Sequence, residues 1–346
     1  MVTIGCDQHK HYCVLATLNE QGKLMEQQKF YHDSPEVIKD YLLKMPQGTQ
    51  LAIEACGYDA WLCDLVESCG VKVHLAHPLK TKAIASAKIK TDTLDAKVLA
   101  QLLHNDFLAE AYYAPKELRE KRYLLRYRQC LVQYQTSLKN RIHGMIDRLG
   151  IRPPEITDLF GKKGIAWLKD LKLASVYTDA MDGYLQVLTT IKERIKESEK
   201  DIQEILDDDP QTTLLQTIPG VGKISAFLLL AEIGPIERFA SAERLCSYAG
   251  LVPSLHQSGQ SLYQGSITKQ GNKFMRWVMV EAAHRALRCD PALSSFYQRI
   301  ERKMGSSKAA VAVARKLLTY VWQVLTKNEV YHYRTIFPNK PVVSRV

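Results

Sequence analysis

Hydrophobic and polar positions along residues 1–112 predict short strands and helices in alternation. Apolar runs cover Val2–Cys6, Tyr12–Leu18 and Lys23–Phe30, and the turn Asn19–Gly22 joins the second run to the third. Two later apolar runs cover 50–55 and 71–76. Helical patterns begin near Ser34 before the first of these runs, near Tyr58 between them, and at Asp92 after the second. We therefore expect three consecutive strands and then two strands separated by helices.

The pattern changes to a long helix from Lys116 to Leu149. Its apolar residues recur at spacings of three, four and seven, which is typical of a coiled-coil seam: Leu124, Leu131, Leu138, Ile142, Met145 and Leu149. A second long helix repeats the rhythm from Leu188 to Ile205, after Pro153-Pro154 and an irregular stretch at 161–182. Residues 113–209 are thus predicted to form an antiparallel helical hairpin or an oligomerisation arm.

A third unit, mainly helical, is predicted over residues 210–330, and residues 331–346 form a short aromatic and basic tail. The strand and helix order of residues 1–112 is that of an RNase H-like fold. The predicted fold class is therefore α/β plus all-α, with an RNase H-like N-terminal domain, a coiled-coil arm and a helical C-terminal domain.

Charge favours a polyphosphate partner without requiring one. Lys and Arg number 47 against 37 Asp and Glu, for a net charge of +10. The eight cysteines show no CxxC spacing, which predicts reduced core residues of a cytoplasmic protein and no zinc site. The N-terminus enters a strand pattern directly, and no apolar run is long enough to span a membrane, so a soluble intracellular protein is expected.

Four acidic residues are candidate metal ligands: Asp7, Glu54, Asp92 and Asp95. Asp7 and Glu54 each follow a strand-like run, and Asp92 and Asp95 share one face at the start of a helix. Carboxylates that converge in this way suit Mg²⁺ and two-metal phosphoryl transfer. The alternatives are a turn residue for Asp7, a surface acid for Glu54, and a helix cap with a dipole-favoured acid for Asp92 and Asp95.

The segment Ile218-Pro219-Gly220-Val221-Gly222-Lys223 has a helix-hairpin-helix pattern. Gly220 and Gly222 allow a tight turn, and the following helix would direct its backbone N–H groups at one phosphate of a nucleic acid. The alternative is a structural helical hairpin.

Basic side chains on two predicted helices could hold a nucleic-acid backbone. They are Arg122, Arg126, Arg128, Lys139 and Arg141 on the first long helix, with tyrosines interleaved, and Lys269, Lys273 and Arg276 near a later helix. A solvated helix surface is the alternative for both groups.

The stretch from Tyr248 to Gly259 is expected to lie between helices and to end in a polar loop. Ser258 beside Gly259 could expose its hydroxyl to a phosphate, although most Ser-Gly pairs are simple turns. His256 could assist Ser258, but an exposed loop histidine is the alternative.

These pieces in this order resemble the IS110 family of insertion-sequence transposases, its IS1111 subgroup included, and the related Piv/MooV-type DNA invertases. The resemblance rests on Asp7-Gln8-His9-Lys10, the strand of Glu54, and Lys90-Thr91-Asp92-Thr93-Leu94-Asp95-Ala96. It extends to Arg126-Tyr127-Arg128, Lys139-Asn140-Arg141-Ile142-His143, Ile218–Gly222, Tyr248–Pro253 and His256-Gln257-Ser258-Gly259.

The resemblance implies a RuvC-like domain, a coiled-coil arm and a serine-bearing transposase domain. It implies Mg²⁺ ligation by Asp7, Glu54, Asp92 and Asp95, and a nucleophilic role for Ser258. Relatives often carry a second serine one position earlier, where this chain has Gln257. The family also implies a homo-oligomer with sites shared between subunits and, in many members, a structured guide (bridge) RNA.

The predicted function is a Mg²⁺-dependent DNA transposase or recombinase that moves an insertion sequence through a phosphoserine intermediate. A junction-resolving nuclease with a RuvC-like domain and a site-specific DNA invertase are the alternatives. A non-catalytic nucleic-acid scaffold and an actin-like ATPase are more distant ones. The sequence contains no P-loop pattern that would favour ATP use.

Overall fold

The computed structural model describes residues 1–57, 59–84, 92–205, 209–258 and 261–331, with the backbone alone for 92–94, 255–258 and 261–264. The chain divides into two compact units, Met1–Lys116 and Glu117–Val346. Along the described parts of the chain, no helix has the length and apolar character needed to cross a membrane.

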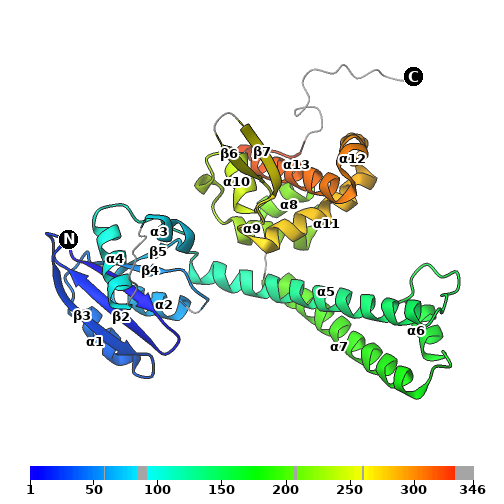
Figure 1. The fold of residues 1–346 in the computed structure, drawn as a ribbon, viewed down its shortest axis with the longest axis horizontal. Coiled ribbons are helices and arrows are strands. Elements are labelled where there is room, and N and C mark those ends of the chain that lie inside the picture. Colours follow the sequence, from blue (N-terminus) through cyan, green and yellow to red (C-terminus); the bar gives the residue numbers. More distant parts are fainter. Residues whose placement is uncertain (58, 85–91, 206–208, 259–260, 332–346) are drawn as a thin grey trace. The chain divides into compact units, whose positions relative to one another are not determined.

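Unit 1 is built on a mixed five-stranded sheet of order β3-β2-β1-β4-β5 (Figure 1). The strands are β1 (Thr3–Gln8), β2 (Tyr12–Leu18), β3 (Leu24–Tyr31), β4 (Gln50–Glu54) and β5 (Lys72–Ala76). β1, β2 and β3 pair antiparallel, whereas β1, β4 and β5 pair parallel. The five predicted strands are confirmed, and this mixed sheet is consistent with an RNase H-like domain.

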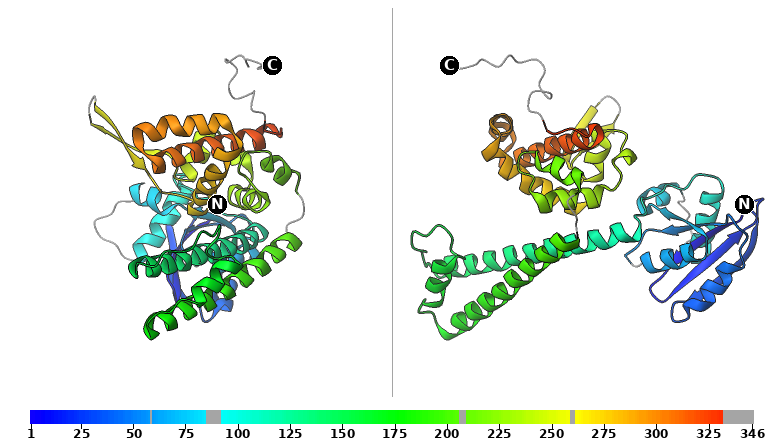
Figure 2. Two further views of the ribbon diagram at one scale, coloured as in Figure 1. Left: turned by 90° about the vertical axis from the view of Figure 1, so that its right-hand side faces the viewer. Right: turned by 180° about the vertical axis from the view of Figure 1, so that it is seen from behind.

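Helices cover both faces of this sheet (Figure 2), and the two faces carry different kinds of residue. Helices α1 (Pro35–Leu43) and α2 (Ala60–Ser68) cover one face. There they pack against large strand side chains such as Ile4 and Ile53. Helix α4 (Asp92–His104) packs on the other face, where the strands present small residues such as Gly5, Ala16 and Ala52. A short helix, α3 (Pro78–Ile84), was not predicted.

Two long helices open unit 2. Helix α5 (Lys116–Arg148) and helix α7 (Ser175–Ile205) run side by side in opposite directions, with α6 (Lys162–Lys169) at their far end (Figure 1). Ile142, Ile146, Phe160, Leu185 and Leu188 pack together there. The antiparallel pair is confirmed, whereas its role in oligomerisation stays a prediction. The expected irregular stretch at 161–182 is wrong, because α6 and the first turns of α7 occupy much of it.

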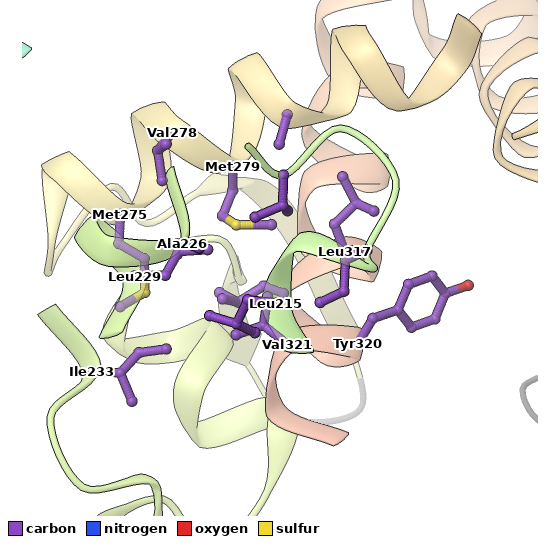
Figure 3. Packing of buried hydrophobic residues seen from close by; sticks show 14 of the residues in the cluster. Leu215, Ala226, Leu229, Ile233, Met275, Val278, Met279, Leu317, Tyr320 and Val321 are labelled. Carbon is purple, nitrogen blue, oxygen red and sulfur yellow. The ribbon is translucent and has the colours of Figure 1, made fainter. Parts of the chain in front are cut away.

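The rest of unit 2 is a helical core (Figure 3). It comprises α8 (Pro210–Gln216), α9 (Lys223–Ile233), the 3-10 turn η1 (Ile236–Arg238), α10 (Ala242–Tyr248), α11 (Lys273–Cys289), α12 (Pro291–Met304) and α13 (Ser306–Lys327). Side chains of α8, α9, α11 and α13 meet in one cluster, which Leu125 of α5 and Ile202 of α7 join. The near ends of the two long helices are therefore anchored on this core.

A two-stranded hairpin, β6 (Pro253–Ser258) and β7 (Ser261–Ile267), is inserted between α10 and α11. The expected polar loop is therefore wrong. Few apolar residues mark these strands, so the sequence resembled a loop, although Gly259 in a two-residue connection is typical of a β-hairpin.

Candidate active site and nucleic-acid contacts

Asp7 and Glu54 lie side by side in unit 1. Cys6 of β1 pairs with Ile53 of β4 in parallel register, so the next residues along the two strands, Asp7 and Glu54, are neighbours. Alternate residues of a strand share a face, which puts Asp7 with Gly5 and Glu54 with Ala52 on the α4 side of the sheet. The structure thus brings two of the four predicted acids to one edge and one face.

Helix α4 approaches that face very closely at Gly5. A Cβ at this position would lie 1.9 Å from the Ala96 carbonyl oxygen, so only glycine allows the contact. Thr3 Oγ1 lies 3.5 Å from His104 Nδ1 at the other end of the helix. Helix α4 therefore runs against the direction of β1, and its first turn is directed toward the end of β1 that carries Asp7.

Asp92 is the first residue of α4, and Asp95 follows one turn later with a half-buried side chain. The side chain of Asp92 lies outside the described residues. Among those that are described, no three His, Cys, Asp or Glu side chains group as a metal site. Asp7 and Glu54 supply hard oxygen donors on one face and fit part of a Mg²⁺ site, while ligation by all four acids stays a prediction.

His9 contacts the predicted ligand Asp7. Its Nε2 atom lies 3.1 Å from Asp7 Oδ2, and its ring lies 4.6 Å from the ring of Tyr12. The Asp7 side chain is only 16% exposed, so His9 limits how its carboxylate can turn. Sequence analysis assigned no role to His9 by itself, although its position two residues after Asp7 was a signal for this contact.

Ser258 is the last residue of β6 and pairs with Ser261 of β7. The connection between them, residues 259–260, and the side chains of His256 and Ser258 lie outside the described residues. Ser258 thus belongs to the turn end of a hairpin, and its nucleophilic role stays a prediction.

The predicted helix-hairpin-helix pattern corresponds to α8, a turn at 217–222, and α9. Gly220 has φ +83°, and a Cβ there would lie 2.1 Å from the Ala282 carbonyl oxygen, so this glycine is needed for packing on α11. Gly222 is the N-cap of α9, and a Cβ there would meet no atom of the described residues within 4 Å. The α9 N-terminus therefore has open space beside its cap residue.

Several predicted nucleic-acid ligands contact the protein itself. Arg126 donates from Nε and from a terminal nitrogen to the two carboxylate oxygens of Glu232, at 2.6 and 2.7 Å, and Glu232 is fully buried. Arg122 donates to the carbonyls of Ala231 and Glu232. Burial opposes the charge of Arg126, but its hydrogen bonds to Glu232 outweigh this and raise its pKa.

The other predicted nucleic-acid ligands form two groups: some bond to the protein itself, and the rest are exposed or half-buried. Arg128 Nε donates to Glu199 at 3.0 Å, and Arg276 donates to the Ala249 carbonyl at 2.8 Å. Arg141, Lys269 and Lys273 are exposed, and Lys139 is half-buried with Nζ 5.3 Å from the Phe160 ring centre. Nucleic-acid binding by any of these side chains stays a prediction.

Comparison with known proteins decides the family. Residues 212–298 match the family model described as Transposase IS116/IS110/IS902 family, and residues 4–151 match the DEDD model of IS110, described as Transposase. The chain belongs to the IS110 family of transposases. Membership assigns it to DNA transposition or recombination, and confirms the resemblance that the motifs indicated.

Relatives of this IS110-family chain include mobile-element and gene-inverting proteins. It is 28% identical over 293 residues to the transposase for insertion sequence element IS1111A of Coxiella burnetii, with 81% of this chain and 79% of the relative covered. A probable family 20 transposase of Pseudomonas aeruginosa is 23% identical, with 94% of each chain covered. The pilin gene-inverting protein of Moraxella bovis is 39% identical over 127 residues, with 36% of this chain and 39% of the relative covered.

Proposed function

We propose that this protein moves an insertion sequence by cutting and joining DNA through a phosphoserine intermediate. Ser258 is the proposed nucleophile, and Asp7, Glu54, Asp92 and Asp95 are the proposed ligands of Mg²⁺. The observation that carries the proposal is the register of β1 and β4, which makes Asp7 and Glu54 neighbours on the face covered by α4. Family membership supplies the reaction class.

The proposed chemistry is an in-line displacement at a backbone phosphate. As Ser258 Oγ loses its proton and bonds to phosphorus, the bond to the 3′ oxygen breaks and that oxygen takes up a proton. Attack by another 3′ hydroxyl on the phosphoserine reverses the step and joins strands, so the link conserves the phosphodiester energy without ATP. Mg²⁺ at the acidic residues would favour ionisation of the serine hydroxyl and stabilise the departing oxygen.

Asp7 would act with a restricted orientation. Its carboxylate is largely buried and is contacted by His9, so it can face incoming DNA with little reorganisation. Glu54 is exposed at the neighbouring strand end and can meet the same phosphate. The two carboxylates would repel the DNA backbone unless a cation lies between them, which accounts for the proposed metal requirement.

We also propose that the working form is a dimer or tetramer in which one subunit's Ser258 meets another subunit's acidic residues. This proposal includes a structured guide RNA that pairs with donor and target DNA. The family resemblance is the reason for including it. Sequencing of nucleic acid that copurifies with the protein tests the RNA. Recovery of DNA alone would contradict it.

The decisive experiment looks for protein covalently attached to cognate DNA in the presence of Mg²⁺. We expect attachment with the native chain and none with Ser258→Ala. Ser254→Ala is the matched control, because Ser254 is on the same strand and its hydroxyl lies against Gly265, where an added Cβ would be 2.4 Å away. Cleaved DNA that is free of protein would instead favour a junction-resolving nuclease that uses water.

DNA inversion is a second candidate, favoured by the similarity to the pilin gene-inverting protein. A plasmid that carries two inverted recombination sites separates the candidates. Reversal of the intervening segment without its loss would support inversion, whereas excision and insertion elsewhere would support transposition.

A further inference from the structure

A cavity of about 580 Å³ lies within unit 2, between the near ends of α5 and α7 and the turn that leads into α9. Its walls come from α5, α7, α9 and α11, and Gly220 and Gly222 of the turn before α9 also line it. This volume is in the range of pockets that hold small organic ligands. None of the chemistry described so far uses its interior.

Gln129 is the unusual residue in this cavity. It belongs to the same α5 face as Leu125, Val132 and Thr136, which also line the cavity, and it is only 2% exposed. Neither its amide nitrogen nor its amide oxygen has a hydrogen-bond partner among the described residues. Buried polar groups are normally paired, so an unpaired amide here indicates a missing partner.

A glutamine amide presents a donor and an acceptor side by side. The same spacing in reverse is found on the N6 and N7 edge of adenine, which glutamine can pair with through two hydrogen bonds. The apolar wall of the cavity includes Leu125, Phe227 and Trp277. A flat base would therefore find both a polar edge to pair with and apolar surface to cover its ring.

Another part of the cavity lining suits an anion. The first backbone hydrogen bond of α9 joins the Ala226 N–H to the Gly222 carbonyl, so the three preceding N–H groups are directed out of the helix end. Lys223 and Arg285 also line the cavity, with Glu281 one turn before Arg285 on α11. A phosphate here would meet the positive end of the helix dipole and two cations.

We propose that this cavity binds one nucleotide extruded from the DNA substrate, with its phosphate at the start of α9 and an adenine base paired to Gln129. The proposal rests on the proposed function only in that DNA is the substrate. It places a base-reading contact beside a turn that would otherwise hold phosphate without regard to sequence. Extrusion costs unstacking energy, which is smallest for an unpaired base.

The test compares two labelled duplexes by fluorescence anisotropy with the full-length protein. One duplex is fully paired, and the other carries a single unpaired adenine. We expect the native chain to bind the second about tenfold more tightly, as one good two-bond base contact provides. Gln129→Leu should abolish this preference, and Gln135→Leu, on the same helix but outside the cavity, should keep it.

Thermal unfolding separates a lost contact from a lost fold. Gln129→Leu removes an unpaired buried amide, so its unfolding temperature should equal or exceed that of the native chain. No preference in the native chain, or a preference that survives in Gln129→Leu, would overturn the proposal.

Free deoxyadenosine monophosphate is the second probe. If it saturates the native chain and the unpaired adenine gives no advantage, the cavity takes a free nucleotide and the proposal is wrong. Either failure leaves the covalent-attachment assay with Ser258→Ala unaffected, because that assay depends on another residue and another product.

Discussion

At the scale of single residues, small side chains on one face of the sheet decide where the acidic residues lie. Gly5, Ala16 and Ala52 leave room for α4 to approach the strands, and Asp7 and Glu54 follow two residues after Gly5 and Ala52 on that same face. The helix that begins at Asp92 is therefore positioned by the same strands that carry the other two acids.

Gly5→Ala tests this dependence. The new Cβ would lie 1.9 Å from the Ala96 carbonyl oxygen and 2.5 Å from the Ala100 nitrogen, so α4 must shift. We expect the free energy of unfolding to fall by about 1–3 kcal/mol, as for other overpacked sites, with loss of DNA cleavage as well. Denaturant unfolding and the cleavage assay measure the two effects.

Gly144→Ala is the control for Gly5→Ala. It adds the same methyl group to α5, where no described atom beyond the helix's own nearby backbone lies within 4 Å of the new atom. We expect a gain of about 0.4–1 kcal/mol from reduced freedom of the unfolded chain. Equal effects of the two substitutions would show that close approach of α4 does not control stability at Gly5.

At the scale of elements, a buried carboxylate joins three segments of unit 2. Glu232 of α9 accepts hydrogen bonds from Arg126 of α5 and, at 2.7 Å, from Nδ2 of Asn272, whose Oδ1 in turn caps α11. Through Asn272 this network reaches the segment that follows β7. Helix α5 and the start of α11 are thus tied to one buried side chain.

Arg126→Met should be strongly destabilising, because it leaves the Glu232 charge buried with weaker compensation from Arg122 and Asn272. We expect a loss of about 3–5 kcal/mol in the free energy of unfolding. Glu232→Leu should cost less, since the side chain of Arg126 is 38% exposed and can turn toward water. The double variant should recover part of the loss, which a double-mutant cycle measures; strict additivity would contradict direct coupling.

Sequence reasoning performed best where the pattern was local. The apolar runs gave all five strands of unit 1, and the heptad rhythm gave the antiparallel pair of α5 and α7. It could not identify Arg126 as a partner of Glu232, because 106 residues separate them and both types usually lie at the surface. The hairpin at Ser258 was missed because its strands lack a clear apolar alternation.

In the acidic site, too, the features set by local sequence were predictable and the others were not. Strand order and register follow from local runs, so the meeting of Asp7 and Glu54 was predictable. The contact of His9 with Asp7 depends on how the chain leaves β1, which no periodic pattern encodes. The cavity around Gln129 was not predictable either, since it forms only where four helices meet.

At the scale of the whole molecule, the net charge of +10 arises from basic side chains in different environments. Arg122, Arg126, Arg128 and Arg276 bond to the chain itself, whereas Arg141, Lys269 and Lys273 are exposed. Exposed cations can neutralise phosphates without loss of internal hydrogen bonds. The basic surface available to DNA is therefore smaller than composition suggests, and the two groups should respond differently to substitution.

Lys273→Gln should weaken DNA binding by a similar factor on every sequence and leave the unfolding temperature unchanged. Because each neutralised phosphate releases counterions, the slope of log K against log salt should become shallower by about one. Lys196→Gln removes the same charge from the exposed surface of α7, and we expect it to keep the native slope. Binding isotherms at several salt concentrations measure both. If Lys196→Gln changes the slope as much as Lys273→Gln does, DNA responds to total charge, and the proposed contact near the start of α11 is wrong.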